Sequence, residues 1–365
     1  MKFDKETSVK VKDKLQSIIA TGKDNVEKAI NDIQTEFEKR KDVIAKPSAL
    51  TYGVSDDHKN IVISMQQKGT AVTLEPTHFA TGQLLNKLKI PLGYAETLME
   101  LNLDSLLTNS ITELSHKLLQ KGVLFRHVDK LLKGVLSPSY RRMDAGPIFE
   151  AFIKQALSMG MVPYNGWNTD YRYSIQFLVP RVYTPAPGEH VVYGASISTS
   201  DYGAQALSLE LMALRVICSN MAIGADVFRH VHIGRRFELP ENEDTIELSG
   251  RTYTLDTKTI ASATKDAMKM LPAAFEILNT KVEKAAHTDL PTEGAMAMLR
   301  NKNLSKDVLQ KVKTMYDLES DITQLPAHKS AWKLSNVISL LAKDPKIGSA
   351  DARLDMSGIA MELLQ

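Results

Sequence analysis

The sequence contains a single cysteine, Cys218, among its 365 residues. One cysteine forms neither an internal disulfide nor a cysteine-cluster zinc site. The sequence also lacks an apolar run of the ~18 residues that a membrane-spanning helix needs, and its first residues lack the apolar core of a signal peptide. These absences predict a soluble protein of a reducing, cytoplasmic compartment that does not contact membranes.

Complete catalytic signatures are likewise missing. We find no phosphate-binding loop of the Walker type, no Gly-x-Gly-x-x-Gly after a strand and no Gly-x-Ser-x-Gly turn, and we predict a non-enzyme without a cofactor. His230 and His232 are the best hint of a metal, because alternate strand positions place both imidazoles on one face. No acidic residue completes a known spacing, and the pair fits a basic surface equally well, so no metal site is assigned.

The net charge excludes no class of binding partner, because 45 Lys and Arg are balanced by 43 Asp and Glu. A charge of +2 is compatible with a basic face that an acidic region elsewhere cancels. Hydrophobic residues make up 43% and charged residues 24% of the chain, which is ordinary for a globular protein and excludes disorder along the whole length.

Hydrophobic periodicity divides the chain into three parts. We predict an α+β protein with a helical N-terminal arm over 1–46, a mostly antiparallel sheet domain over 47–255 and a helical C-terminal subdomain over 256–365. The arm shows two amphipathic runs separated at Gly22, and it packs either on its own domain or on a neighbouring subunit. Such helical ends favour a homo-oligomer.

In the middle part, the spacing of hydrophobic residues changes several times between that of strands and that of helices. Strands are predicted over 60–65, 70–74, 123–128, 172–179, 190–198, 207–218 and 227–233. Helices are predicted within 77–120, with a new start at Pro91, and over 147–157. In the last part, the predicted helices cover 260–286 with a kink or break at Pro272, then 304–316, 329–342 and 350–364.

Basic and aromatic residues gather in this middle part. Residues 121–202 hold 12 of the 23 aromatic residues, and residues 121–236 carry 13 Lys and Arg against 8 Asp and Glu. Single-stranded nucleic acid is bound by this mixture, because cations follow the phosphates while aromatic faces stack bases. The alternative is that Tyr and Phe simply suit strands and that Arg solubilises the outer face.

Within this window, Ser137-Pro138 predicts a turn, which the paired arginines 141 and 142 follow before a helix capped by Asp144. The pair would bind an anion there, or it would pair locally with Asp144 or Glu150. Arg215 stands alone in an apolar strand and needs a partner or an anion. The predicted phosphate contacts are Arg141, Arg142, Arg215, Arg229, Arg235 and Arg236, and the predicted base-stacking side chains are Tyr140 and Trp167.

Four short segments resemble, in order along the chain, a family of phage and plasmid proteins described as domain of unknown function 932. They are Gln83-Leu84-Leu85-x-x-Leu88-x-Ile90-Pro91, Leu136-Ser137-x-x-Tyr140-Arg141, Arg215-Val216-Ile217-Cys218-Ser219-Asn220 and Trp332-x-x-x-Asn336-Val337. The chain departs from the family pattern at Met221 and Ser335. The resemblance implies a protein of a phage or other mobile element, in a bacterial host's cytoplasm, and by analogy a likeness to phage single-strand annealing proteins.

These observations together predict a non-enzymatic mobile-element protein that binds or anneals single-stranded DNA in recombination or replication. The alternative is a structural or protein-interaction component of such an element that does not bind nucleic acid.

Overall fold

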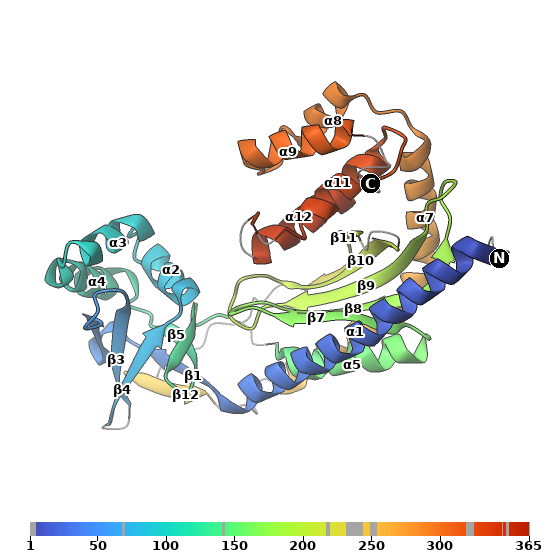
Figure 1. Cartoon of the computed structure of the whole chain (residues 1–365). Helices are drawn as coiled ribbons and strands as arrows, with labels where there is room; N and C mark the ends of the chain where they lie inside the picture. The colour runs from blue at the N-terminus through green and yellow to red at the C-terminus, as the bar shows by residue number, and fades with distance from the viewer. Residues whose placement is uncertain are drawn as a thin grey trace.

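The protein is described by a computed structural model over residues 5–67, 70–140, 143–216, 220–230, 244–248, 254–318, 325–344, 346–347 and 350–364. It forms two lobes, each with its own sheet and its own apolar core (Figure 1). The predicted α+β class, with mostly antiparallel sheets and helices at both ends of the chain, is confirmed. The two sheets differ from the single sheet domain expected over 47–255. Helices within residues 77–120 bury the first sheet separately, before the chain enters the second sheet.

The smaller lobe contains a seven-stranded sheet in the order β12-β1-β5-β6-β4-β3-β2. Its strands are β1 (Arg40–Ala45), β2 (Leu50–Val54), β3 (Ile61–Gln67), β4 (Thr70–Pro76), β5 (Val123–Val128), β6 (Leu131–Leu136) and β12 (Thr245–Leu248). A short 3-10 turn (Pro47–Ala49) precedes β2. Paired strands are antiparallel except β4 and β6, which are parallel. Helices α2 (His78–Lys87), α3 (Leu92–Glu100) and α4 (Asp104–Leu118) bury Leu84, Leu98 and Leu107 in the core of this lobe.

The larger lobe contains a five-stranded antiparallel sheet in the order β11-β10-β9-β8-β7. Its strands are β7 (Val162–Asn168), β8 (Tyr173–Tyr183), β9 (Val191–Thr199), β10 (Leu207–Arg215) and β11 (Asn220–His230). Helix α5 (Ala145–Ser158) packs Phe149 and Phe152 into the core that contains Ile175 and Phe177 of β8. Phe152 and Phe177 meet edge to face. Alternate residues of β8 therefore face the opposite side of the sheet.

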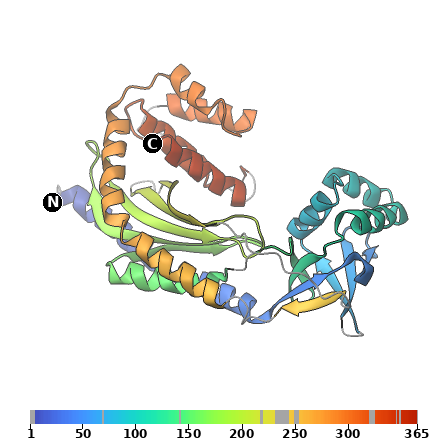
Figure 2. The same ribbon diagram turned by 180° about the vertical axis from the view of Figure 1, so that it is seen from behind.

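The C-terminal part is helical, as predicted. Its helices are α6 (Thr254–Met268), α7 (Leu271–His287), α8 (Thr292–Leu299), α9 (Lys306–Asp317), α11 (Ala331–Leu341) and α12 (Ala350–Glu362). The predicted break at Pro272 is confirmed, because Pro272 lies in the first turn of α7. Ser305 caps α9 by accepting a hydrogen bond from the Val308 amide. Figure 2 shows α6 beside α5, while α11 and α12 pack against β11.

The N-terminal arm is one uninterrupted helix, α1 (Lys5–Lys39), which continues directly into β1 (Figure 1). The predicted break at Gly22 is wrong. Gly22 instead lets α1 approach β7, since a Cβ there would lie 2.3 Å from the Tyr164 carbonyl oxygen. Val26 and Ile33 are buried in the core of the larger lobe, so α1 packs on its own chain. The predicted helical end over 40–46 is also corrected, because that segment forms the buried strand β1.

Candidate nucleic-acid interface

A cleft of about 730 Å³ lies between the five-stranded sheet and the C-terminal helices. Its floor is the sheet face opposite α5, because it is lined by Ser174 of β8, whose neighbour Ile175 belongs to the core beneath. Asp355, Met356 and Ile359 of α12 line the other side. The segments 204–206 and 301–304 complete the lining. The cleft is therefore bordered by sheet, helix and two connections.

Five side chains in direct cross-strand register cross the floor of this cleft. Trp167 pairs with Ser174, Ser174 with Ser198, Ser198 with Ser208, and Ser208 with Arg229. All five residues line the cleft. With strands ~4.8 Å apart, this register row extends over roughly 19 Å. An aromatic ring and a guanidinium are thus placed at opposite ends of a line of three hydroxyls.

The floor around the register row is polar and partly lacks hydrogen-bond partners. Ser174 and Ser196 hydroxyls lie 3.1 Å apart. The Nε2 atom of Gln205 and both amide atoms of Gln176 are buried without a hydrogen-bond partner in the described part of the chain. Gln205 lines the cleft. A buried donor without a partner costs free energy of about 1–3 kcal/mol, which a polar ligand in the cleft would recover.

Cations and carboxylates meet across the cleft. Arg172 Nη1 lies 3.6 Å from Asp355 Oδ1, and Lys302 pairs with Glu362. Both carboxylates belong to α12, whereas Arg172 belongs to the connection before β8 and Lys302 to segment 301–304. The carboxylates of α12 thus pair with cations that line the cleft.

Of the predicted site residues that the structure describes, it brings Trp167 and Arg229 together at the cleft. Their separate strands meet through the register row, which no local sequence pattern specifies. The predictions for Arg141, Arg142, Arg235 and Arg236 lie outside the described residues, as do the prediction for His232 and that for the side chain of His230.

Arg215 differs from the prediction, because it is buried in an ion pair. Its Nε and Nη2 atoms donate to Glu189 at 2.5 and 2.8 Å. The Trp332 indole donates to the same carboxylate at 3.0 Å. Because the guanidinium is 5% exposed, we assign it a structural role instead of a phosphate contact.

Tyr140 also lies apart from the cleft, at the junction of the two lobes. Its hydroxyl donates to the Ser200 carbonyl at 2.9 Å, and the Arg126 guanidinium lies 5.4 Å from its ring centre. Burial raises the pKa of this phenol well above its ordinary value. One ring face is therefore taken by a cation of the protein, which disfavours the predicted stacking role.

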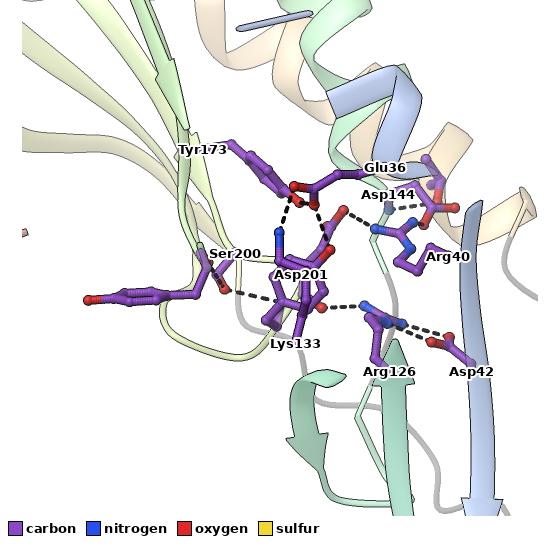
Figure 3. Close-up of polar contacts among 12 residues, drawn as sticks. Glu36, Arg40, Asp42, Arg126, Lys133, Asp144, Tyr173, Ser200 and Asp201 are labelled. Atoms are coloured by element: carbon purple, nitrogen blue, oxygen red, sulfur yellow. Dashed lines mark hydrogen bonds and ion pairs between the residues drawn. The ribbon is translucent and has the colours of Figure 1, made fainter. Parts of the chain in front are cut away.

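The junction contains two buried arginines that tie the lobes together (Figure 3). Arg126 of β5 donates to both oxygens of Asp42 at 2.6 and 2.7 Å and also to the Asp201 carbonyl. Arg40 of β1 pairs with Asp144 and Asp201 of the larger lobe. Both guanidinium groups are 1% exposed. The Asp144 side chain thus pairs with Arg40. The sequence predicts that this side chain caps α5, but it forms no capping hydrogen bond there.

Glu36, near the end of α1, collects three donors at the same junction (Figure 3). It accepts from Lys133 Nζ at 2.6 Å and from the hydroxyls of Tyr173 and Tyr202 at 2.8 and 2.7 Å. Burial raises the pKa of both phenols, which therefore remain protonated donors at neutral pH. The network couples α1, the smaller lobe and the five-stranded sheet, and it gives no sign of an open site.

Sequence reasoning missed the serines of the register row, although a signal was present. Ser174, Ser198 and Ser208 alternate with buried Ile and Leu along their strands. A period-two pattern of small hydroxyl residues on three successive strands indicates one polar sheet face. Arg172 is one of the 13 basic residues over 121–236, but its place at the cleft depends on the turn before β8.

Comparisons with protein-family models, with curated proteins and with solved structures give no match for this chain. In the part of the chain that the structure describes, no helix is long and apolar enough to cross a membrane. The same residues contain no cluster of three His, Cys, Asp or Glu side chains arranged to hold a metal ion.

Proposed function

We propose that this protein is a non-enzymatic nucleic-acid-binding protein that holds single-stranded DNA in the cleft between sheet and C-terminal helices. The register row from Trp167 to Arg229 carries this proposal. Its aromatic ring supplies a stacking face, its half-buried Ser198 and Ser208 supply donors to phosphate oxygens, and its arginine supplies a cation. None of these groups reads a base edge in a fixed geometry, so binding is expected to be largely independent of sequence.

The shape of the cleft favours one strand over a duplex. The floor is about 19 Å long across the strands, which accommodates roughly five bases at ~3.4 Å per base. Helix α12 covers the opposite side. A duplex presents two backbones and hides the base faces, and its grooves are read by an inserted helix or ribbon, which this floor does not offer.

Fluorescence anisotropy with a labelled oligonucleotide tests the proposal. We expect the parent protein to bind a single strand more tightly than the matching duplex, with log K falling linearly as log salt rises. Trp167→Ala should weaken binding of every sequence by ~1–3 kcal/mol with little change of the salt slope, because stacking releases no counterions. Tyr94→Ala, an exposed aromatic on the smaller lobe, is the matched control and should bind as the parent does. Absence of oligonucleotide binding by the folded parent at low salt contradicts the proposal.

The resemblance to proteins of phages and plasmids supports the biological part of the proposal, namely annealing or protection of single strands during recombination or replication of a mobile element. An annealing assay with two complementary strands, followed by fluorescence transfer, distinguishes annealing from binding alone.

A structural or interaction component of a mobile element is the second candidate. Large apolar side chains are exposed on the smaller lobe at Tyr94, Leu101, Leu103 and Leu106, with exposed fractions of 43–62%. Exposed apolar groups that gather in one segment are typical of protein interfaces. This candidate predicts that replacing Leu101 and Leu106 with lysine abolishes the activity in the host, because ammonium groups are costly to bury in an interface, while changes in the cleft leave it intact.

A further inference from the structure

A second pocket, of about 370 Å³, lies on the smaller lobe where α2, α4 and β6 end. Three lysines line it, Lys87, Lys117 and Lys121, and none of the residues lining it is acidic. None of these lysines forms an ion pair within the described part of the chain. The pocket is thus a concave site with positively charged side chains and no negatively charged side chain among its lining residues.

Helix dipoles within the protein stabilise the positive charges of these three lysines only in part. Lys87 and Lys117 lie in the last turns of α2 and α4, where the helix dipole favours a cation. Lys121 lies in the turn that follows α4, beyond that effect. Burial lowers the pKa of Lys87, and no carboxylate acts against this. An anion within the pocket would stabilise all three ammonium groups together.

This lysine pocket borders the cleft across a single turn of the larger lobe. Leu136 lines the pocket, and Gly203 packs against it so closely that a Cβ on Gly203 would lie 2.7 Å from the Leu136 side chain. The residues that follow, Ala204 to Ala206, line the cleft. Phe79 of α2 stacks on Tyr171 of the larger lobe with ring centres 4.2 Å apart, which holds the two lobes together beside this turn.

We propose that Lys87, Lys117 and Lys121 bind backbone phosphates of the same nucleic-acid strand after it leaves the cleft past the Gly203 turn. This inference rests on the proposed function, because it assigns a second contact region to the strand held there. It predicts that the footprint of the protein is longer than the register row and extends onto the smaller lobe.

The test compares a triple variant, K87Q/K117Q/K121Q, with a matched control, K59Q/K89Q/K130Q. The control removes three exposed lysines of the same lobe that do not line the pocket. With a ~30-nucleotide single strand, the pocket variant should lose affinity by on the order of tenfold at low salt and its salt slope should fall by about two, since each phosphate contact on a single strand contributes ~0.7. With a strand of about six nucleotides, which fills only the register row, it should bind as the parent does. The control should bind both lengths nearly as the parent does.

Several outcomes overturn the inference without touching the proposed function. One is a pocket variant that binds the long strand like the control while Trp167→Ala still weakens binding. Another is binding of inorganic pyrophosphate in the pocket, measured by isothermal titration calorimetry, while the effect of the pocket variant on affinity does not depend on oligonucleotide length. That result makes the pocket a site for a free phosphate compound. A third is lower thermal stability of K87Q/K117Q/K121Q with unchanged affinity, which restricts the lysines to the helix dipoles. If no oligonucleotide binds the parent at all, the proposed function itself fails.

Discussion

Arg126 and Asp42 at the lobe junction show what one pair of side chains contributes. Their side chains are 1% and 0% exposed, and two hydrogen bonds join them. Removal of one charge leaves the other buried without its partner, and that loss is far larger than the net contribution of the intact pair.

Asp42→Asn should therefore lower the free energy of unfolding by about 3–5 kcal/mol. Chemical denaturation, followed by circular dichroism, measures this change. Because the cost arises from the unpaired charge, the double variant Asp42→Leu with Arg126→Met should recover a large part of the stability. If the single variant unfolds at the same denaturant concentration as the parent, the junction is open to water and this account is wrong.

Asp355 tests the competition between carboxylate and phosphate in the cleft. Its side chain is 71% exposed and lies 3.6 Å from Arg172. An exposed pair of this kind contributes about 0.2–1 kcal/mol. Asp355→Asn should accordingly raise the affinity for single-stranded DNA up to about fivefold at low salt, while the loss of the pair lowers the melting temperature by at most about 2 °C.

Asp266→Asn is the control for this charge change, because Asp266 of α6 is exposed, pairs with Lys269 just after that helix, and does not line the cleft. It should leave affinity nearly unchanged. Equal effects of the two variants would indicate that net charge alone acts, without a specific competition by α12.

At the scale of elements, helix α1 is shaped by two glycines at its contact with β7. A Cβ on Gly22 would lie 2.3 Å from the Tyr164 carbonyl oxygen, and one on Gly166 would lie 2.8 Å from α1 backbone atoms. Both neighbours are backbone atoms, so relief requires movement of the helix or the strand. The close approach is what covers the edge of the sheet at β7, which would otherwise expose unpaired backbone groups.

Gly22→Ala should therefore destabilise the protein by about 1–3 kcal/mol through overpacking, although Ala is the better helix former by ~1 kcal/mol. Gly82→Ala in α2 is the matched control, because no atom lies within 4 Å of its Cβ position. That control should be neutral or slightly stabilising. Thermal melts of both variants decide the point, and a stabilised Gly22→Ala protein would show that α1 does not press on β7.

At the scale of the whole molecule, the predicted homo-oligomer remains a prediction. Helix α1 packs on its own sheet. Apolar side chains are instead exposed on the smaller lobe at Leu101 and Leu106, and at Met270 and Ile277 of the C-terminal part. These two regions lie in different lobes and suit a contact between copies.

Light scattering at micromolar protein should give a mass that is a multiple of the 40.5 kDa chain. Leu101→Lys combined with Leu106→Lys should shift the mass toward that of one chain, because burial of two ammonium groups in an interface is costly. A mass of one chain for the parent, with and without single-stranded DNA, would contradict the oligomer.

The sequence by itself determined the local elements, because their signals are local. Pro272 separates α6 from α7, Ser305 caps α9, and the apolar stripe over 147–157 forms α5. Strands β3, β5, β8, β9 and β10 follow from runs of apolar or alternating residues. The α+β class follows from the order of these elements.

Only the tertiary structure decided where α1 continues, which sheets form and which side chains meet. Gly22 reads as a helix break until β7 is beside it, and strands β1, β6, β7 and β12 are specified by their partners more than by their own composition. The register row is the clearest case. Trp167 and Arg229 lie far apart in sequence, and four strand pairings place them at opposite ends of one line. Each pairing joins consecutive strands, and its register depends on the turn between them together with the apolar face of both strands. The row from Trp167 to Arg229 therefore needs four turns and four pairings at once, which no single stretch of sequence shows.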